Sequence, residues 1–388
     1  MMKRVYLDYA ATTPTDPEVI KAMQPYFFDK FGNPSSIHAF GQEAKKAIED
    51  SREKVASFLG AKPEEIIFTS GGTESNNSAV EGVAYALEGR GNHIITTVIE
   101  HHAITEPCKF LEKKGFKVTY VGVDKNGLVS PEDVKKAITA KTILISVMHA
   151  NNEIGVIEPI AEIGRISREK GIYFHTDAVQ TTGHIPVNVD ELNVDLLSLS
   201  AHKFYGPKGV GVLYIRKGTR VERFLHGGDQ ENGRRASTHN TPAIVGLGKA
   251  IELCQNKMEA ESKFQISLRD KIIKQITDKI PEVYLNGHPK IRLPNNVNFS
   301  IKYIEGESII LNLDMLGIAV STGSACTSTS LEPSHVMLAI GLSHELAHGS
   351  VRITLGRWIQ EDEIDYLLEH LPNIVEKLRA MSPLYEKK

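Results

Sequence analysis

Between residues 66 and 215 short apolar runs alternate with helical patterns, and this alternation constrains the fold more than any other feature of the sequence. The apolar runs have the length of buried strands, and the segments between them carry apolar residues at helical spacing. The runs lie at 66–69, 94–98, 118–121, 142–148, 172–174, 196–199 and 210–215, and the helical patterns at 74–87, 105–114, 131–137 and 160–169. Such alternation predicts a mostly parallel sheet wrapped by helices.

The pattern changes on both sides of this region. Helices are predicted over 17–26 and 44–59, and a long charged helix over 243–280 leads into strands at 296–301 and 319–322 and a helix at 306–316. A chain of 388 residues exceeds the roughly 250–300 residues that one hydrophobic core supports. We therefore predict a large domain over 15–258 and a smaller α+β domain formed by 1–14 and 259–388.

Composition excludes several classes of protein. With 45 basic and 48 acidic side chains the net charge is −3, so no basic field for nucleic acid is implied. No apolar run is long enough to span a membrane, and the N-terminal residues lack the apolar region of a secretory signal, so we expect a cytoplasmic protein. Three cysteines are too few and too scattered for a disulfide framework or a four-thiolate zinc site.

Lys203 stands at the end of the apolar run 196–199, within the sequence SAHK. The glycines and the proline that follow turn the chain, which places Lys203 at the mouth of a strand. A lysine with an ordinary pKa of roughly 10.4 becomes a nucleophile only when it is desolvated or lies beside other cations, and His202 and Lys208 are close in sequence. An isolated lysine is more often an exposed turn residue.

Other polar groups also follow apolar runs, where ligands bind in open parallel sheets. Residues 70–77 (SGGTESNN) lead from a strand into a helix, which suits a phosphate but lacks the lysine of a nucleotide-hydrolysing loop. His101 can stack on a flat ring, Asp177 can hold a cation, and Asn152 can bond a ring oxygen. Each residue alone has an ordinary alternative: a glycine turn, a surface histidine or a helix cap.

One ligand accounts for all of these groups together. The aldehyde of pyridoxal phosphate condenses with a lysine, its phosphate suits a helix N-terminus, and its ring nitrogen meets an aspartate. The sequence therefore predicts a pyridoxal phosphate enzyme, with Lys203 as the Schiff-base lysine and Asp177 at the ring nitrogen.

Two further features lie in the C-terminal part. Residues 321–330 (STGSACTSTS) consist of small and hydroxyl residues around Cys326, which predicts a mobile loop over about 321–333 with a nucleophilic thiol. Arg352 lies in an alternating strand pattern, and its planar fork suits a substrate carboxylate. The alternatives are an incidental cysteine and a structural ion pair.

Six motifs in register carry a family resemblance over essentially the whole chain. They are SGGTESNN, EHHA, MHANNEIG, HTDAVQ, SAHKFYGPKGVG and STGSACTSTSLEPSH. In this order they resemble the NifS and IscS cysteine desulfurases, of the first of the two desulfurase groups. The resemblance implies the aspartate aminotransferase-like fold type I, with a large, mostly parallel seven-stranded sheet domain and a smaller α+β domain. It also implies a homodimer that takes sulfur from L-cysteine, with L-alanine and a persulfide on Cys326 as the products. The persulfide sulfur would then pass to a scaffold protein for iron–sulfur clusters or to other sulfur acceptors.

The resemblance also implies roles for single residues. Lys203 would carry the cofactor, His101 would stack on the ring and transfer protons, and Cys326 would attack the substrate sulfur. The remaining cofactor contacts would come from Gly72, Thr73, Asn152, Asp177, Gln180, Ser200 and His202, with Thr238 reaching from the other subunit. Arg352, Asn33 and Asn152 would hold the substrate carboxylate.

One departure from the family bears on these roles. Ser237 stands where the family usually has glycine, which weakens the expected contact of Thr238. Two alternatives to a desulfurase stay open: a pyridoxal phosphate β-lyase or aminotransferase, which would not need Cys326, and a non-catalytic sulfur carrier or assembly scaffold, in which Cys326 is an iron–sulfur ligand.

Overall fold

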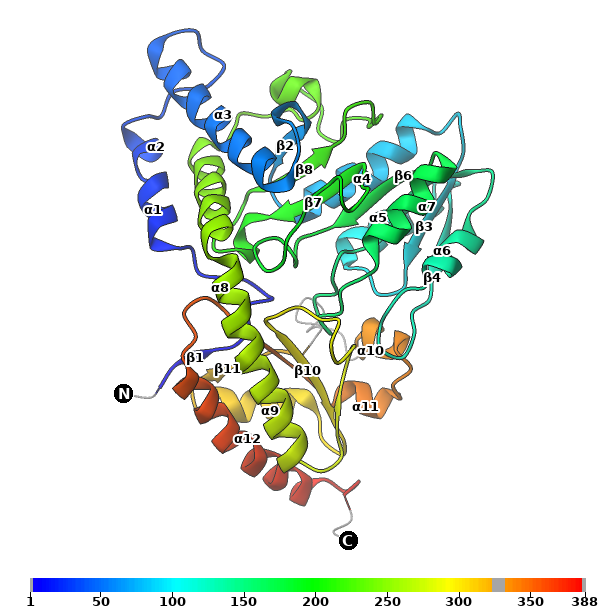
Figure 1. The fold of residues 1–388 in the computed structure, drawn as a ribbon, viewed down its shortest axis with the longest axis vertical. Coiled ribbons are helices and arrows are strands. Elements are labelled where there is room, and N and C mark those ends of the chain that lie inside the picture. Colours follow the sequence, from blue (N-terminus) through cyan, green and yellow to red (C-terminus); the bar gives the residue numbers. More distant parts are fainter. Residues whose placement is uncertain (1–2, 323–331, 386–388) are drawn as a thin grey trace.

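The computed structural model describes residues 3–322 and 332–385. Cys326 and most of its predicted loop lie outside the described residues. A wide sheet with its helices forms the upper part of the molecule in Figure 1, and a smaller layered part lies below it. The long helix α8 (Thr241–Lys279) runs through both.

The large sheet has seven strands, as the sequence and the resemblance predicted. In spatial order they are β2 (Ile66–Thr69), β8 (Gly211–Ile215), β7 (Leu196–Ser200), β6 (Tyr173–Asp177), β5 (Thr142–Ser146), β3 (His93–Thr97) and β4 (Lys117–Val121). All of the strands run parallel except β8, which pairs antiparallel with both β2 and β7. The carboxyl ends of the parallel strands therefore share one edge, where the predicted site residues follow.

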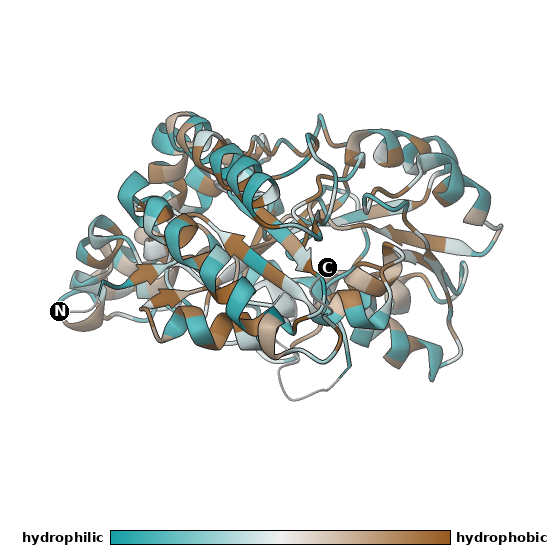
Figure 2. Cartoon of the chain, turned by 90° about the horizontal axis from the view of Figure 1, so that it is seen from below, coloured by the Kyte–Doolittle hydropathy of each residue, from teal (hydrophilic) through white to brown (hydrophobic). Residues whose placement is uncertain are grey.

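Both faces of this sheet are buried, which explains why its strands are continuous apolar runs. Along β2, Ile66 and Phe68 point into one hydrophobic core and Ile67 into another, because successive side chains alternate. The helices that cover the first face are α1 (Pro17–Met23), α3 (Ala39–Leu59), α6 (Pro131–Ala137), α7 (Ile160–Lys170) and the first half of α8; those that cover the second are α4 (Gly72–Ala86) and α5 (His102–Glu112). Figure 2 shows the matching pattern, with polar residues on the outer sides of the helices.

The smaller part has its own core, which combines Val5 and Leu7 with side chains from the second half of α8 and from the C-terminal segments. Its strands are β12 (Ser350–Thr354), β10 (Asn296–Ile301) and β9 (Val283–Leu285), which form an antiparallel sheet, and β1 (Val5–Tyr6) and β11 (Ile318–Ala319), which pair in parallel. Its helices are α9 (Gly306–Asp314), α10 (His335–Ala339), α11 (His344–His348) and α12 (Glu361–Met381). The exact domain boundaries stay a prediction, and α8 crosses residue 258 without a break.

Three of the differences from the sequence-based expectation have a clear local description. The helix predicted over 17–26 ends at Met23, because Pro25 starts a second short helix, α2 (Pro25–Phe28). The strand predicted over 319–322 is only partly formed, since β11 ends at Ala319 and Ser321 makes an isolated bridge to Arg352. The helix predicted from residue 105 begins at His102, because the His101 side chain caps it.

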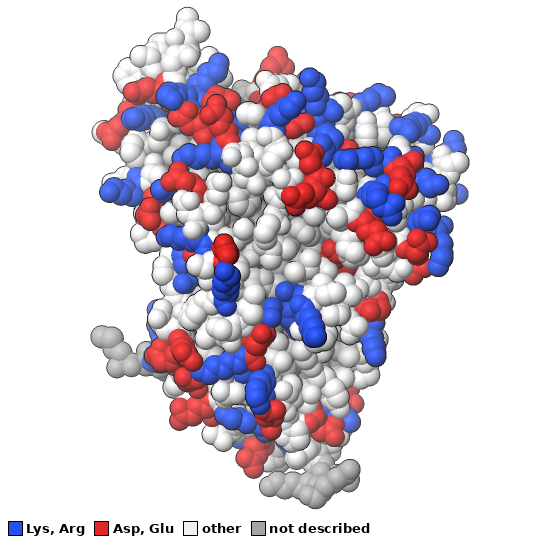
Figure 3. Space-filling view, viewed as in Figure 1, with Lys and Arg blue, Asp and Glu red and all other residues white. Residues whose placement is uncertain are grey.

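Two surface properties bear on partners. On the face drawn in Figure 3, positive and negative side chains are interleaved over most of the molecule. Within residues 3–322 and 332–385, no helix is long and apolar enough to cross a membrane.

Candidate active site

A cavity of about 450 Å³ lies where the predicted strand-end residues converge. Ten of the site residues predicted from the sequence line it: Gly72, Thr73, His101, Asn152, Asp177, Gln180, Ser200, His202, Lys203 and Arg352. The wall is completed by Arg352 from β12 in the smaller part and by Ala10 and Ala11 from the N-terminal segment. The cavity therefore lies between the two parts of the molecule.

Lys203 ends a short 3-10 helix, η2 (Ala201–Lys203), directly after β7. Its Nζ donates to the carbonyl oxygens of Ala10 at 2.6 Å and Ala11 at 2.8 Å. The turn behind it is tight, since Tyr205 has a φ of +67° and the Gly206 amide returns to the Ala201 carbonyl. The amine of Lys203 is thereby held at the cavity wall by two consecutive carbonyl groups of the N-terminal segment.

Asp177 is the last residue of β6, and its carboxylate is fixed by two donors. Oδ1 accepts from the Val179 amide at 2.9 Å, and Oδ2 accepts from Asn76 Nδ2 at 2.6 Å. The two hydrogen bonds fix the orientation of the carboxylate and leave lone pairs for a cationic partner. Asn76 Oδ1 is buried and has no hydrogen-bond partner among the described residues. The sequence analysis assigned Asn76 no role, although it lies one helical turn beyond Gly72.

His101 is the N-cap of α5, and its Nδ1 accepts from the Ala103 amide at 3.1 Å. A neutral ring in this arrangement carries its proton on Nε2. Burial lowers the pKa of His101, and the nearby Lys203 and His102 act in the same direction, while the Asp177 carboxylate opposes them. His101 is therefore a neutral, flat ring at the cavity wall near pH 7.

The first turn of α4 forms the predicted phosphate cradle. Gly71, its N-cap, has φ 154° and ψ −178°, a conformation that is essentially restricted to glycine. A side chain on Gly72 would come within 2.9 Å of Val179, so the backbone stays open to the cavity. The first amides of a helix lack intrahelical partners and attract anions. Ser200 and His202 line the same cavity, and burial, together with Lys203 and Lys208, lowers the pKa of His202 to about 4.

Arg352 faces the cavity from β12 and is 2% exposed. Its Nη1 donates to the Asn152 carbonyl at 3.0 Å and its Nη2 to Asp8 Oδ1 at 2.8 Å. Its Nε is buried without a partner in the described part of the chain. A buried N–H that lacks an acceptor costs free energy, so this guanidinium is suited to a carboxylate ligand.

The sequence assigned no role to His102 and His335, which line the cavity, or to the buried Glu100, which precedes His101 in the chain. His335 Nε2 donates to the Glu100 carbonyl at 3.0 Å, and the His102 and His335 rings lie 5.2 Å apart. Burial raises the pKa of the Glu100 carboxyl to about 8. The EHHA and LEPSH motifs contain these residues, but nothing in their spacing indicated that α10 lies beside α5. Among the described residues, no group of three or more His, Cys, Asp or Glu side chains could hold a metal ion.

Two of the predicted residues lie elsewhere. Asn33 and Thr238 line a separate recess of about 170 Å³, and both are exposed. Within one chain the structure therefore does not bring them to Lys203.

This fold and this set of residues define a pyridoxal phosphate enzyme of fold type I. Such a cofactor and an amino-acid substrate require three groups that the structure provides. They are the Arg352 Nε that lacks an acceptor, the Asp177 carboxylate that is held by two hydrogen bonds, and the open N-terminus of α4.

Comparisons with known proteins agree. Residues 5–367 match the family Aminotransferase class-V. A relative from Dictyoglomus turgidum, "Cysteine desulfurase IscS", is 61% identical over 99% of this chain and 97% of its own length. A solved "NifS-like protein" is 41% identical with a TM-score of 0.92 and covers 97% of this chain and 100% of its own; "SspA in complex with cysteine" is 39% identical, with a TM-score of 0.80, and covers 90% and 98%. The chain belongs to the class-V aminotransferase family, within its cysteine desulfurases of the NifS and IscS type.

Proposed function

We propose that this enzyme removes sulfur from L-cysteine, with L-alanine and a persulfide on Cys326 as products. The observation that carries the proposal is the convergence of Lys203, Asp177, His101 and the α4 N-terminus on one cavity, opposite Arg352. When bound, pyridoxal phosphate supplies an electron sink for bonds broken next to the α-carbon of an amino acid. The remaining steps are derived for the side chains of this chain.

The cofactor would be held at five points. Lys203 would bind its aldehyde carbon, Asp177 its protonated ring nitrogen, and His101 would lie against its ring. The phosphate would be held by Gly72, Thr73, Ser200 and His202, and the ring hydroxyl side by Asn152 and Gln180. The Gln180 side chain is oriented for this contact, since its Nε2 donates to the Ala10 carbonyl at 3.1 Å.

Arg352 would bind the substrate carboxylate with the help of Asn152. The two are already joined through the Asn152 carbonyl, so the guanidinium is held in one orientation before substrate binds. Because its lowered pKa keeps His101 unprotonated near pH 7, the ring would be able to accept a proton at Nδ1 once the Ala103 amide gives up its hydrogen bond to that atom.

Cys326 would take the sulfur as a thiolate. A bond forms between the Cys326 sulfur and the substrate sulfur, the carbon–sulfur bond breaks, and its electron pair remains on the carbon that becomes the methyl group of alanine. The chain enters residues 323–331 beside the site, because Ser321 and Arg352 exchange two backbone hydrogen bonds. Five residues of extended chain reach roughly 17 Å, which is enough to bring Cys326 from Ser321 into the cavity.

We also propose a homodimer, in which Thr238 and Asn33 serve the site of the partner subunit. Both residues lie together on the surface, beside an exposed apolar patch that one chain leaves uncovered. This patch consists of Phe27, Phe28, Phe31, Ile37 and Phe40, which are 67%, 83%, 68%, 94% and 54% exposed. A cluster of this kind is typical of an interface.

The sulfur acceptor is proposed to be a scaffold protein for iron–sulfur clusters, together with other sulfur acceptors. The support is the similarity to relatives named IscS. Cys326 as a transient iron–sulfur ligand, the cytoplasmic location and the lack of nucleic-acid partners stay predictions.

The decisive experiment compares the wild type with Cys326→Ala. We expect alanine and sulfide from L-cysteine and a thiol reductant with the wild type, and loss of both products with the variant, which keeps the colour of the lysine-bound cofactor. A variant with full turnover would favour a β-lyase or aminotransferase. A colourless wild-type protein without turnover would favour the non-catalytic scaffold.

A further inference from the structure

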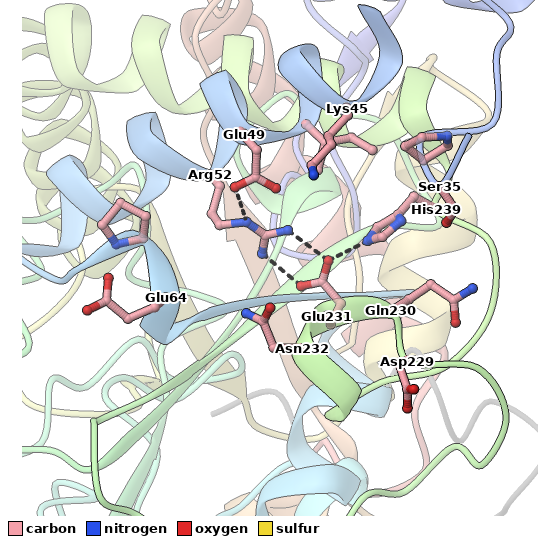
Figure 4. Close-up of a pocket in the computed structure, with 13 residues that line it drawn as sticks. Ser35, Lys45, Glu49, Arg52, Glu64, Asp229, Gln230, Glu231, Asn232 and His239 are labelled. Atoms are coloured by element: carbon pink, nitrogen blue, oxygen red, sulfur yellow. Dashed lines mark hydrogen bonds and ion pairs between the residues drawn. The ribbon is translucent and has the colours of Figure 1, made fainter. Parts of the chain in front are cut away.

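A second recess, of about 710 Å³, shares no lining residue with the cavity of Lys203. It lies between α3, the loop before β2 and the short 3-10 helix η3 (Gln230–Gly233). Figure 4 shows a connected set of charged side chains inside it, with Glu231 at the centre between Arg52 and His239. None of these three residues has a part in the function proposed above.

Glu231 is a fully satisfied buried anion. Its side chain is 1% exposed and accepts from Arg52 Nη1 and Nη2, each at 2.8 Å, from the Phe68 amide at 2.8 Å and from His239 Nε2 at 2.5 Å. Burial alone would raise the pKa of Glu231, but the hydrogen bonds from Arg52 and His239 lower it to about 2. A carboxylate bound in this way fixes the positions of the groups that donate to it, namely Arg52, the Phe68 amide and His239.

Arg52 ties this anion to the framework of the large sheet. It projects from α3, and its Nη1 also donates to the Ile66 carbonyl at the start of β2. Its guanidinium lies over the Phe68 ring, 4.8 Å from the centroid. Glu231 is therefore anchored to a helix and a strand that cannot shift independently.

His239, the residue next to Thr238, is held in place by its hydrogen bond to Glu231. The carboxylate of Glu231 bonds to His239, so residues 231 and 239 are clasped together and the chain between them forms a closed loop. This loop, residues 231–239, is also held at Arg235, which pairs with Glu74 at 2.8 Å. Thr238 is exposed near the end of the loop and lines the separate recess that also contains Asn33.

The loop is strained, which shows that its shape is imposed. Glu231, Asn232 and Ser237 all have positive φ, at 50°, 55° and 94°. L-residues rarely adopt such angles, and strain of this kind persists only where surrounding contacts enforce it. At Ser237 the backbone keeps the conformation that suits glycine, although a side chain is present.

We infer that Arg52, Glu231 and His239 are positioning residues, which hold Thr238 in the orientation in which it reaches the cofactor phosphate in the partner subunit. The inference rests on the proposed homodimer and on the proposed contact of Thr238 across it. The ion pair acts in one chain, and its effect is felt in the site of the other.

The test uses heterodimers with one competent site, made by pairing a Lys203→Ala chain with a chain that keeps Lys203. The readout is the dissociation constant of pyridoxal phosphate, titrated into the apo heterodimer through the visible absorbance of the lysine-bound cofactor. Glu231→Gln on the Lys203→Ala chain should weaken binding at the competent site about tenfold, equivalent to about 1.4 kcal/mol. Glu231→Gln on the chain that keeps Lys203 should leave binding unchanged. Equal effects in the two arrangements, or no effect in either, would overturn the inference.

Two further variants guard against a simple folding defect. His239→Ala removes the donor to Glu231 and should repeat the tenfold loss in the same arrangement, whereas His239→Gln, which keeps a nitrogen donor near the position of Nε2, should restore binding. Glu49→Gln is the matched control, because Glu49 bonds the opposite side of Arg52 at 3.1 Å and does not touch the loop. Loss of binding with Glu49→Gln as large as with His239→Ala would count against a specific role of the loop.

Thr238→Ala separates this inference from the proposed function. If Thr238→Ala on the Lys203→Ala chain leaves binding at the competent site intact, the contact between subunits is wrong, and the inference is wrong with it. If Thr238→Ala weakens binding but neither Glu231→Gln nor His239→Ala does, the contact stands and the positioning role is refuted.

Discussion

At the scale of single residues, the electrostatics of the cavity depend on side chains that touch one another from distant parts of the sequence. Asp177 is bonded to Asn76, 101 positions away, and Arg352 to Asp8, 344 positions away. Such pairs set the charge and orientation of the groups that would meet the cofactor and the substrate.

Asn76→Ala tests the first of these pairs. The change removes one of the two donors to Asp177 and should lower the free energy of unfolding of the apoenzyme by about 1–3 kcal/mol. It should also shift the absorbance of the lysine-bound cofactor, because the Asp177 carboxylate is no longer fixed. Asn77→Ala is the control, since Asn77 donates to the Ala103 carbonyl instead. An unchanged spectrum in Asn76→Ala would show that Asn76 does not act through Asp177.

His101 predicts the acid limb of the pH profile. A proton acceptor is active when it is unprotonated, so activity is lost as the pH falls through its pKa. Burial lowers this pKa from its ordinary value near 6.5, and the limb of kcat/KM assigned to His101 should therefore lie below pH 6.5. His101→Gln should abolish this limb and His102→Gln should keep it. An acid limb above pH 7 that His101→Gln removes would contradict the assignment.

Because ligands bind at strand ends, the sequence could predict the site residues that directly follow a strand, but not those that other elements bring to the site. Lys203, Asp177 and His101 follow apolar runs directly, so their position in the sheet could be predicted. Asn76 and His335 act through neighbours that only the packing of helices brings near, and no local pattern indicates such a contact. The role of Cys326 still rests on the family resemblance.

At the scale of elements, α8 is the feature with the widest influence. Its first half packs in the core of the large sheet through residues such as Leu247 and Ile251, and its second half in the other core through Leu268 and Ile272. Lys203 belongs to the first body and Arg352 to the second, so this helix helps to set the width of the cavity between them.

Ala260→Pro tests this role of α8. Ala260 is exposed in the helix interior, where proline removes a hydrogen bond and should cost about 3 kcal/mol of unfolding free energy, whereas Ala260→Gly should cost about 1 kcal/mol. Because a kink displaces Arg352 relative to Lys203, the proline variant should also raise KM for L-cysteine. Chemical denaturation and steady-state kinetics measure the two effects. A normal KM in a destabilised proline variant would show that α8 does not set the cavity.

The bounds of the strands of the large sheet and of most helices that cover it were predicted to within a few residues, because their apolar periodicity is strong. The errors fall where a local contact overrides periodicity. Pro25 divides the first helix, and the His101 cap starts α5 before its apolar pattern begins. The helices α10, α11 and α12 were not predicted. The first two are short and have no long periodic stretch, whereas α12 has one and was missed all the same.

At the scale of the whole molecule, the exposed phenylalanines from α2 to the start of α3 indicate a surface that a second chain covers. We expect Phe28→Glu to convert the protein to a monomer and, because Thr238 is then lost from the partner site, to weaken cofactor binding. Phe110→Glu, at a half-exposed phenylalanine on α5, is the control and should leave the mass unchanged. Light scattering measures the mass. A Phe28→Glu variant that remains dimeric would exclude this patch as the centre of the interface.

The wall of the cavity combines residues of the N-terminal segment with residues that are synthesised later. Asp8, Ala10 and Ala11 are synthesised well before Lys203 and Arg352, the residues that they hold. A domain that folds during synthesis can complete the large sheet early, but not this wall. Because the wall needs Arg352, the nascent chain cannot form the complete cavity before this residue has left the ribosome, and stable loading of the cofactor has to follow its synthesis.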